Sequence, residues 1–524
     1  MQAAHRVAKN TLILYARMAI TVFISLYSTR LILAALGVSD FGLFNVVGGV
    51  ISMLGFLNAS MAAATQRFIS FAQGEGDLEK VKRIFNMSSL LHWGIAILVF
   101  FVLEVAGYFF FNGILNIAPD RVGVAKIIYQ FMIVSTLFTV ISVPYEAVIT
   151  SHENMMVYAM LGIVEALLKL GIAIYITHAA FDHLMIYGCL MALLAILLLV
   201  IRRIYCHRVY KECVLNIKVF FDKPLLKEIS GYAGWSLLGT SSSILVNYGQ
   251  GVILNVFFGT IVNAAQGISA QISGQLNVFA TTLIKALNPT IDKSEGAGNR
   301  SAMLNATMIG SKISFFLIMV FYIFFLIELP YIFKLWLKNI PQYAVVFCRL
   351  LLIRNLIEQL FIPLASAISA QGNIKDYQIR ASILLFFPLI ISYLLFKYEY
   401  PPYALYIIFI IYSILASCII LYYTKKNCEL SIKDFLFKVI LRCVACFCIV
   451  FSLAFLPHMI MQESLMRLIF VGFVTFIFFI VFVFLIGFSK NEKQEIKELV
   501  KFFINKASKN KFKKLVFSNY TSIQ

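Results

Sequence analysis

Apolar runs of about 20 residues or more, separated by short polar segments, recur from one end of the chain to the other. A helix of that length can cross the hydrocarbon core of a bilayer, so each run predicts a membrane-spanning helix. The pattern therefore predicts an all-α integral membrane protein with about 14 transmembrane helices. The predicted spans are 11–36, 41–66, 84–111, 124–150, 154–178, 181–204, 230–258, 262–289, 303–328, 342–369, 377–397, 403–424, 433–456 and 465–488.

The composition argues against a soluble protein. Hydrophobic residues make up 61% of the chain and charged residues only 13%, against about 25% charged residues in ordinary soluble domains. At the N-terminus, a short polar segment with Arg6 and Lys9 leads into an apolar run longer than the core of a secretory signal. We expect this run to be the first spanning helix.

Basic residues are distributed unevenly between the two sides of the predicted bundle. Thirty of the 44 Lys and Arg residues fall in or beside the connections and tails that would share one side, whereas the loops on the other side hold only Arg121, Lys334 and Lys338. Because basic loops stay in the cytoplasm, both termini are expected there. Contacts with anionic lipids then account for the formal net charge of +19 without nucleic acid as a partner.

The two halves of the chain match when the sequence is shifted by 222 residues. The shift places Gly37 on Gly259 and Gly76 on Gly298, and lays "GEGDLEKV" over "GAGNRSAM". Each half holds an even number of spans, so the copies would be parallel repeats around a central cavity. The expected parts are an N-lobe of helices 1–6 (1–204), a basic cytoplasmic linker (205–229), a C-lobe of helices 7–12 (230–425), two extra helices (426–488) and a basic cytoplasmic tail (489–524).

Polar residues form stripes on the seventh and eighth predicted helices, at the three- and four-residue spacing of one helix face. Such a stripe must face protein or water, which leaves two interpretations open: close helix packing, or a hydrated cleft between the lobes. The amide and ammonium side chains exceed what close packing needs and favour the cleft. The candidate cavity residues in these stripes are Ser236, Thr240, Asn247, Gln250, Asn277, Thr281 and Lys285.

Cations within the apolar runs cost about 2.5–3.5 kcal/mol each at a helix centre, so they should be paired or functional. Lys285 and Arg30 have no acidic residue within a helical turn, which favours contact with an anionic ligand. Arg17 and Arg67 lie nearer cytoplasmic ends, where snorkelling to lipid headgroups is an equal alternative. All four are assigned to the candidate substrate cavity.

A second set of charged residues could couple ions or form internal pairs: Glu104, Glu146, Glu165, Lys169, Arg354 and Glu358. The last four form two pairs with a spacing of four residues, which lets opposite charges meet along one helix. Glu146 follows Pro144 near the end of the fourth helix and is either an interfacial carboxylate or a protonation or cation-coupling site. Glu104 is a similar candidate.

The sequence carries no signature of metal or cofactor chemistry. The seven histidines lack ligand spacing such as HExxH, and the nine cysteines are scattered, with one cluster inside an apolar run. There is no phosphate-binding loop of the kind that ATPases use. We expect no metal, no cofactor and no enzymatic activity.

Three segments resemble a known family: "RLILAALGVSDFGLFNVVGG", "QRFISFAQGEGDLEKVKRIFNMSS" and "KALNPTIDKSEGAGNRSAM". They are similar to the polysaccharide-transporter branch, the Wzx-type O-antigen and capsule flippases, of the multidrug/oligosaccharidyl-lipid/polysaccharide (MOP) superfamily. The likeness lies in glycine and hydropathy patterns of helices 1–2 and 7–8. One departure is "FGTIVNAAQGI", which lacks an aromatic residue often found in that turn.

The resemblance implies a MATE-like fold and a flippase that works by alternating access. Its substrate would be an undecaprenyl-pyrophosphate-linked oligosaccharide, moved across the bacterial inner membrane for O-antigen, capsule or exopolysaccharide synthesis. Arg17, Arg30, Arg67 and Lys285 stand where the family has a cationic cavity. A polysaccharide polymerase and chain-length proteins are implied as partners.

Two other functions stay open. A MATE-type drug/cation antiporter would share the fold but would place carboxylates deep in one lobe. A membrane-embedded glycan polymerase or acyltransferase would need a sizeable outer loop or an intramembrane catalytic set, and the predicted outer loops are short.

Overall fold

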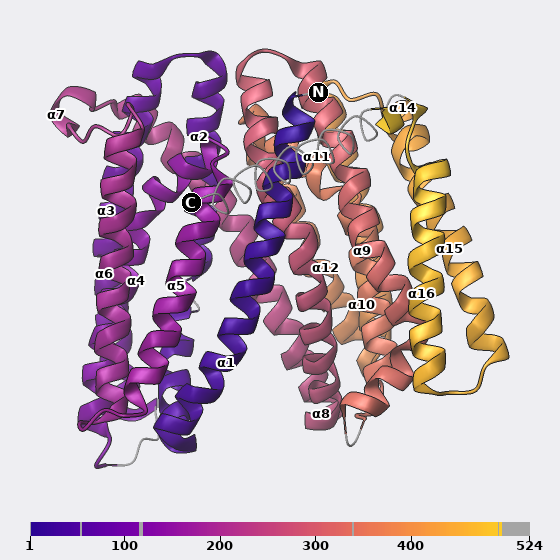
Figure 1. Cartoon of the computed structure of the whole chain (residues 1–524), viewed down its shortest axis with the longest axis horizontal. Helices are drawn as coiled ribbons and strands as arrows, with labels where there is room; N and C mark the ends of the chain where they lie inside the picture. The colour runs from indigo at the N-terminus through magenta and orange to yellow at the C-terminus, as the bar shows by residue number, and fades with distance from the viewer. Residues whose placement is uncertain (1, 53–54, 115–118, 338–339, 491, 495–524) are drawn as a thin grey trace, which may run out of the picture.

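The computed structural model describes residues 2–52, 55–114, 119–337, 340–490 and 492–494, and within these ranges it contains helices and no strand (Figure 1). The elements are α1 (Gln2–Ser52), α2 (Gly55–Glu75), α3 (Leu78–Phe109), η1 (Phe110–Ile114), α4 (Val122–Ser151), α5 (Met155–Ile176), α6 (His183–Val209), α7 (Ile217–Phe220), α8 (Lys223–Gly296), α9 (Arg300–Trp336), α10 (Ala344–Gln359), α11 (Ile362–Gln371), α12 (Lys375–Lys397), α13 (Ala404–Cys428), α14 (Ile432–Phe435), η2 (Leu436–Ile440), α15 (Leu441–Ile460), α16 (Leu465–Phe482) and η3 (Val483–Gly487).

Eleven helices in the described part of the chain are long and apolar enough to cross a membrane. One of them, α8, has 74 residues, or about 110 Å of helix at 1.5 Å per residue, far more than one crossing of a core about 30 Å thick. The short helices α10 and α11 together cover the predicted span 342–369. The prediction of an all-α, multi-pass membrane protein is confirmed, whereas the number fourteen stays a prediction.

Two long helices bend at glycines that the sequence shift pairs. Gly37 in α1 has φ 71° and ψ 172°, and Gly259 in α8 has φ 77° and ψ −171°. Side-chain-bearing residues rarely adopt positive φ because Cβ meets the following carbonyl. The polar breaks predicted near residues 36–41 and 258–262 are therefore sharp bends within continuous helices.

The turns at the other end of the bundle are also paired. Gly76 has φ 78° and Gly298 has φ 69°. Beside them, Asp77 accepts a hydrogen bond from the backbone amide of Lys80 and Asn299 from that of Ala302, so each caps the helix that follows. We call the end that holds Gly76 and Gly298 the turn end, and the end that holds Gly37 and Gly259 the kink end.

Helices α1–α6 and α8–α13 form two groups that meet at the turn end (Figure 1). A Cβ on Gly74 would overlap the carbonyl oxygen of Lys293, and a Cβ on Gly296 would overlap that of Phe71. The 222-residue shift converts one contact into the other, since Phe71 maps to Lys293 and Gly74 to Gly296. The two groups therefore touch through a pseudo-symmetric backbone contact that only glycine permits.

The helices α15 and α16 pack on the outer side of the second group (Figure 1). A buried charge cluster joins them to α9: Arg467 donates to Glu328 over 2.8 Å, and His458 Nδ1 lies 3.1 Å from the same carboxylate. Glu328 is fully buried, so its pairing with Arg467 fixes the position of this added pair. Most of the predicted C-terminal tail, 495–524, lies outside the described residues.

The connection between the two groups is attached at the turn end. The Glu212 carboxylate contacts His152, and Gln73 Nε2 donates to it over 3.5 Å. Burial alone would raise the pKa of Glu212, but the hydrogen bonds from His152, its own backbone and Gln73 outweigh burial and lower the pKa. The carboxylate stays ionised at neutral pH and holds the linker against α4.

Candidate functional site

Lys285 of α8 reaches across to the first group of helices. Its Nζ lies 3.2 Å from Glu146 Oε1 on α4 and donates to the hydroxyl of Tyr158 on α5. The same ammonium lies 4.0 Å from the centroid of the Tyr158 ring, a cation–π contact. The sequence shows no acidic partner within a turn of Lys285; the structure supplies one from 139 residues away.

Two arginines surround this pair. Arg17 of α1 places its guanidinium 4.5 Å from the Tyr158 centroid. Arg202 of α6 lies 3.9 Å from Glu146 Oε2 and donates to Ser142 over 2.9 Å. We call Arg17, Glu146, Tyr158, Arg202 and Lys285 the central cluster. It brings together four helices of the first group and one of the second.

The central cluster has more positive than negative charge, and one of its buried nitrogens lacks a hydrogen-bond partner. Its three cations share one carboxylate, which leaves two positive charges uncompensated within the cluster. Arg17 Nε is buried and hydrogen-bonds to no described atom, while the Lys285 side chain is 40% exposed. A buried polar atom without a hydrogen-bond partner is costly, and the excess positive charge favours a negatively charged partner. An anion with several oxygens would supply what the cluster lacks.

An exposed face of α8 leads from Lys285 toward the kink end. The residues at spacings of four and three along this face are all exposed: Gly267, Gln271, Gly274, Val278 and Thr281. Lys285 follows Thr281 by four residues and so lies on the same face. Apart from Val278, which is 39% exposed, this face carries only glycine, glutamine and threonine, whereas α15 and α16 expose many large apolar side chains.

Contacts between the two groups continue from the central cluster to the turn end. Lys293 Nζ lies 3.2 Å from Glu153 Oε1, and Gln66 Nε2 donates to Asp292 over 2.9 Å. These contacts, with the glycine contact of Gly74 and Gly296, close the turn end. The central cluster lies at the inner limit of this closed region.

Comparison with known proteins gives a fold but no close relative. No family model and no curated protein matches the sequence. The solved structures that match include a mutant of a MATE transporter, with a TM-score of 0.71 at 13% identity over 81% of this chain and 96% of that one. The chain has the fold of the MATE transporters.

Other structures with the MATE fold agree. An outward-facing conformation of a multidrug resistance MATE family transporter of the MOP superfamily has a TM-score of 0.67 at 14% identity, covering 81% of this chain and 95% of that one. A MOP superfamily transporter from Pyrococcus furiosus gives 0.65 at 14%, with the same coverage. The predicted MATE-like fold class is thereby confirmed.

Within this MATE fold, the other predicted cavity cations lie away from the central cluster. Arg67 is buried at the turn end, where Nε and Nη2 donate to the carbonyl of Ala370 over 3.2 and 2.7 Å. Arg30 is exposed on α1. It lies 13 residues beyond Arg17, about 20 Å along the helix. The structure brings together Arg17 and Lys285 but neither Arg30 nor Arg67.

Some residues of the predicted polar stripes of α8 pack against other side chains, and others are exposed. Thr240 accepts a hydrogen bond from Ser60 of α2 over 3.0 Å and donates to the carbonyl of Ser236. Gln250 is buried and donates to the exposed Asn247 over 3.4 Å. In the second arm of α8, Thr281 is exposed, and the buried Asn277 Oδ1 has no hydrogen-bond partner among the described residues.

The second predicted set of charged residues does not form a single site. Glu165 and Lys169 pair over 2.8 Å along α5, and Arg354 pairs with Glu358 over 2.7 Å along α10. Glu146 belongs to the central cluster, and Glu104 lines a separate pocket.

Sequence reasoning missed Tyr158 and Arg202. Arg202 stands at the start of a basic stretch that follows the sixth predicted span, and Tyr158 is one of 25 tyrosines. Neither shows a spacing signal, because their partners come from other helices. Within the described residues, no group of three or more histidine, cysteine or acidic side chains is placed to hold a metal ion.

Proposed function

We propose that this chain is a flippase that moves a polyprenyl-pyrophosphate-linked oligosaccharide across a bacterial inner membrane by alternating access. The observation that carries the proposal is the central cluster: two arginines and a lysine around one carboxylate, at the junction of the two helix groups. A guanidinium can hold phosphate oxygens through a bidentate fork, and an ammonium acts as a point charge. A pyrophosphate matches this combination.

The exposed face of α8 suits the rest of such a substrate. Gln271 and Thr281 offer hydrogen-bonding groups along this face, and the two glycines leave room beside them. In our proposal the glycan occupies the hydrated space between the groups, while the polyprenyl tail stays in the bilayer.

Glu146 gives the cluster a way to respond to its ligand. Without substrate, its carboxylate occupies Lys285 and so ties α4 to α8. A pyrophosphate competes for the same ammonium, and its binding would release the ion pair between the groups. Substrate binding would thereby ease opening of the turn end, which the positive-inside pattern assigns to the cytoplasm.

A drug/cation antiporter is the second candidate. It is favoured by the MATE fold of the solved structures that this chain resembles. The fold alone does not determine ligand charge, since the Pyrococcus furiosus transporter is described as having a binding pocket of reverse polarity that suggests a different function. In this chain, the excess of cations in the central cluster favours an anionic substrate.

Replacing Lys285 by alanine is expected to abolish surface polysaccharide assembly in the host while the protein remains in the membrane at its normal level. Arg30→Ala tests whether the exposed kink-end cation also contacts substrate. The readouts are glycan display on cells and immunoblots of membranes. Wild-type glycan display in the Lys285 variant would contradict the assignment of the cluster.

A further inference from the structure

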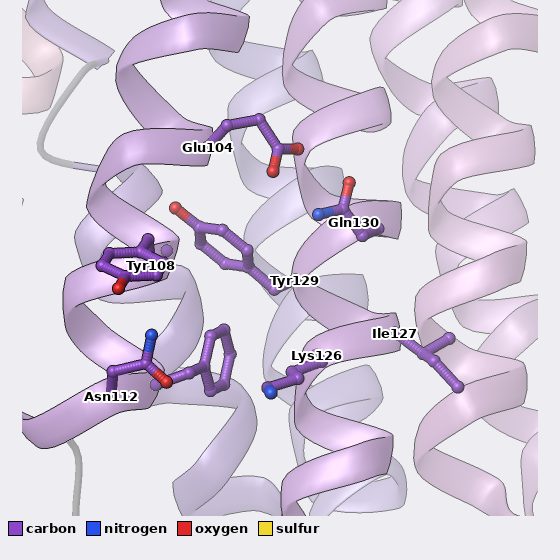
Figure 2. Close-up of a pocket in the computed structure, with 9 residues that line it drawn as sticks. Glu104, Tyr108, Asn112, Lys126, Ile127, Tyr129 and Gln130 are labelled. Carbon is purple, nitrogen blue, oxygen red and sulfur yellow. The ribbon is translucent and has the colours of Figure 1, made fainter.

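A pocket of about 470 Å³ lies between α3 and α4, apart from the central cluster (Figure 2). Its polar lining residues are Glu104, Tyr108, Asn112, Lys126, Tyr129 and Gln130. It forms where α3 widens into the π-helical turn η1, an irregularity that often marks functional sites. Its volume lies within the usual range of ligand pockets.

The pocket opens toward the bilayer. On α3, Phe101, Val105 and Tyr108 follow one another at spacings of four and three and are 63%, 59% and 68% exposed. On α4, Ile127 beside the pocket is 41% exposed. Large exposed apolar side chains within a spanning helix contact acyl chains. A ligand would therefore enter from the lipid.

The pocket holds two opposite charges that are not paired. Among the described residues, neither Glu104 nor Lys126 forms an ion pair or a hydrogen bond, and the Lys126 ammonium lies 6.0 Å from the centroid of the Phe111 ring, which also lines the pocket. Asn112 and Gln130 likewise make no side-chain hydrogen bond within the described chain. Glu104 lies farther inside its helix, and an intramembrane carboxylate without a partner is costly and indicates a ligand.

The two charges lie at different depths. Gly107 of α3 packs against the ring of Tyr129 of α4. Glu104 lies three residues from that contact toward the turn end, and Lys126 three residues toward the kink end, so their backbones are about 9 Å apart along the helices. Figure 2 shows Glu104 at one end of the pocket and Lys126 with Asn112 at the other.

We propose that this pocket binds the headgroup of a phospholipid that carries a phosphate and a primary ammonium, taken from the leaflet at the kink end. Lys126 lies near the helix end, at headgroup depth, and contacts the phosphate. The ammonium turns inward to the Glu104 carboxylate, while Gln130, Asn112 and Tyr108 bond the remaining oxygens. The acyl chains lie along Phe101 and Val105. The site is independent of the transport proposal.

The test is native mass spectrometry of the full-length protein with phosphatidylethanolamine or phosphatidylglycerol. Wild type is expected to retain phosphatidylethanolamine preferentially. Glu104→Gln should lower that preference about tenfold, since a charge-assisted hydrogen bond is lost. Lys126→Gln should weaken the binding of both lipids, because both carry the phosphate that Lys126 contacts in the proposal. Glu463→Gln, which removes an exposed carboxylate at the kink end, is the control and should retain the wild-type preference.

Two results would overturn the proposal. One is equal retention of the two lipids by wild type. The other is an unchanged preference in Glu104→Gln, which would place the bound lipid elsewhere on the surface. A thermal unfolding midpoint close to that of wild type shows that each variant is folded.

Discussion

Lys285→Ala and Glu146→Gln are expected to change the affinity for a polyprenyl pyrophosphate in opposite directions. The alanine variant loses a charge-assisted contact and should bind at least about tenfold more weakly. The glutamine variant removes the anion that competes for Lys285 and leaves the central cluster more positive, so it should bind roughly tenfold more tightly. Affinity is measured on purified protein in detergent.

The opposite signs separate ligand binding from structure. Both substitutions break the same contact between α4 and α8, so a purely structural role would weaken binding in both variants. Lys438→Ala serves as the matched control, because it removes a lysine from an exposed ion pair with Asp434. Its affinity should equal that of wild type. Weaker binding in Glu146→Gln would contradict competition between Glu146 and the pyrophosphate.

The double variant Gly74→Ala/Gly296→Ala is expected to hold the turn end open. Each added methyl group would meet a backbone carbonyl, of Lys293 or of Phe71, that cannot move as a side chain can. Overpacking costs about 1–3 kcal/mol per site, enough to shift a two-state equilibrium by tenfold or more. Electron–electron distances between spin labels at Glu79 and Ser301, beside the two turns, report the opening.

Wild type should give a short distance between these labels, and the double variant a population at longer distance with loss of transport. Gly171→Ala is the control, because a Cβ on this glycine of α5 has open space and should leave both readouts unchanged. An unchanged label distance in the double variant would show that the glycine contact does not determine closure.

The repeat could be predicted from the sequence because its glycines adopt backbone conformations that other residues rarely adopt. Gly37 and Gly259 bend their helices at positive φ, and Gly76 and Gly298 make the matching turns. Such positions tolerate few other residues, so they remain recognisable where apolar positions vary freely. The helix ends were harder to predict, since α8 continues through the bend that interrupts its hydropathy.

The central cluster was only half predictable. Lys285 and Arg17 stand out as cations in apolar runs, but Glu146 meets Lys285 only because the two helix groups pack together. Arg67 is also a cation in an apolar run, but it donates to the carbonyl of Ala370 at the turn end and does not join the central cluster. Sequence identifies costly charges; the packing of distant helices determines which of them share a site.

The most direct measurement is transbilayer movement of a fluorescent polyprenyl-pyrophosphate oligosaccharide in liposomes that contain the purified protein. The account predicts that wild type makes the substrate of the inner leaflet accessible to an external quencher, and that Lys285→Ala reduces this rate to that of empty liposomes. No movement of this substrate by wild type, together with proton-driven movement of an organic cation, would contradict it.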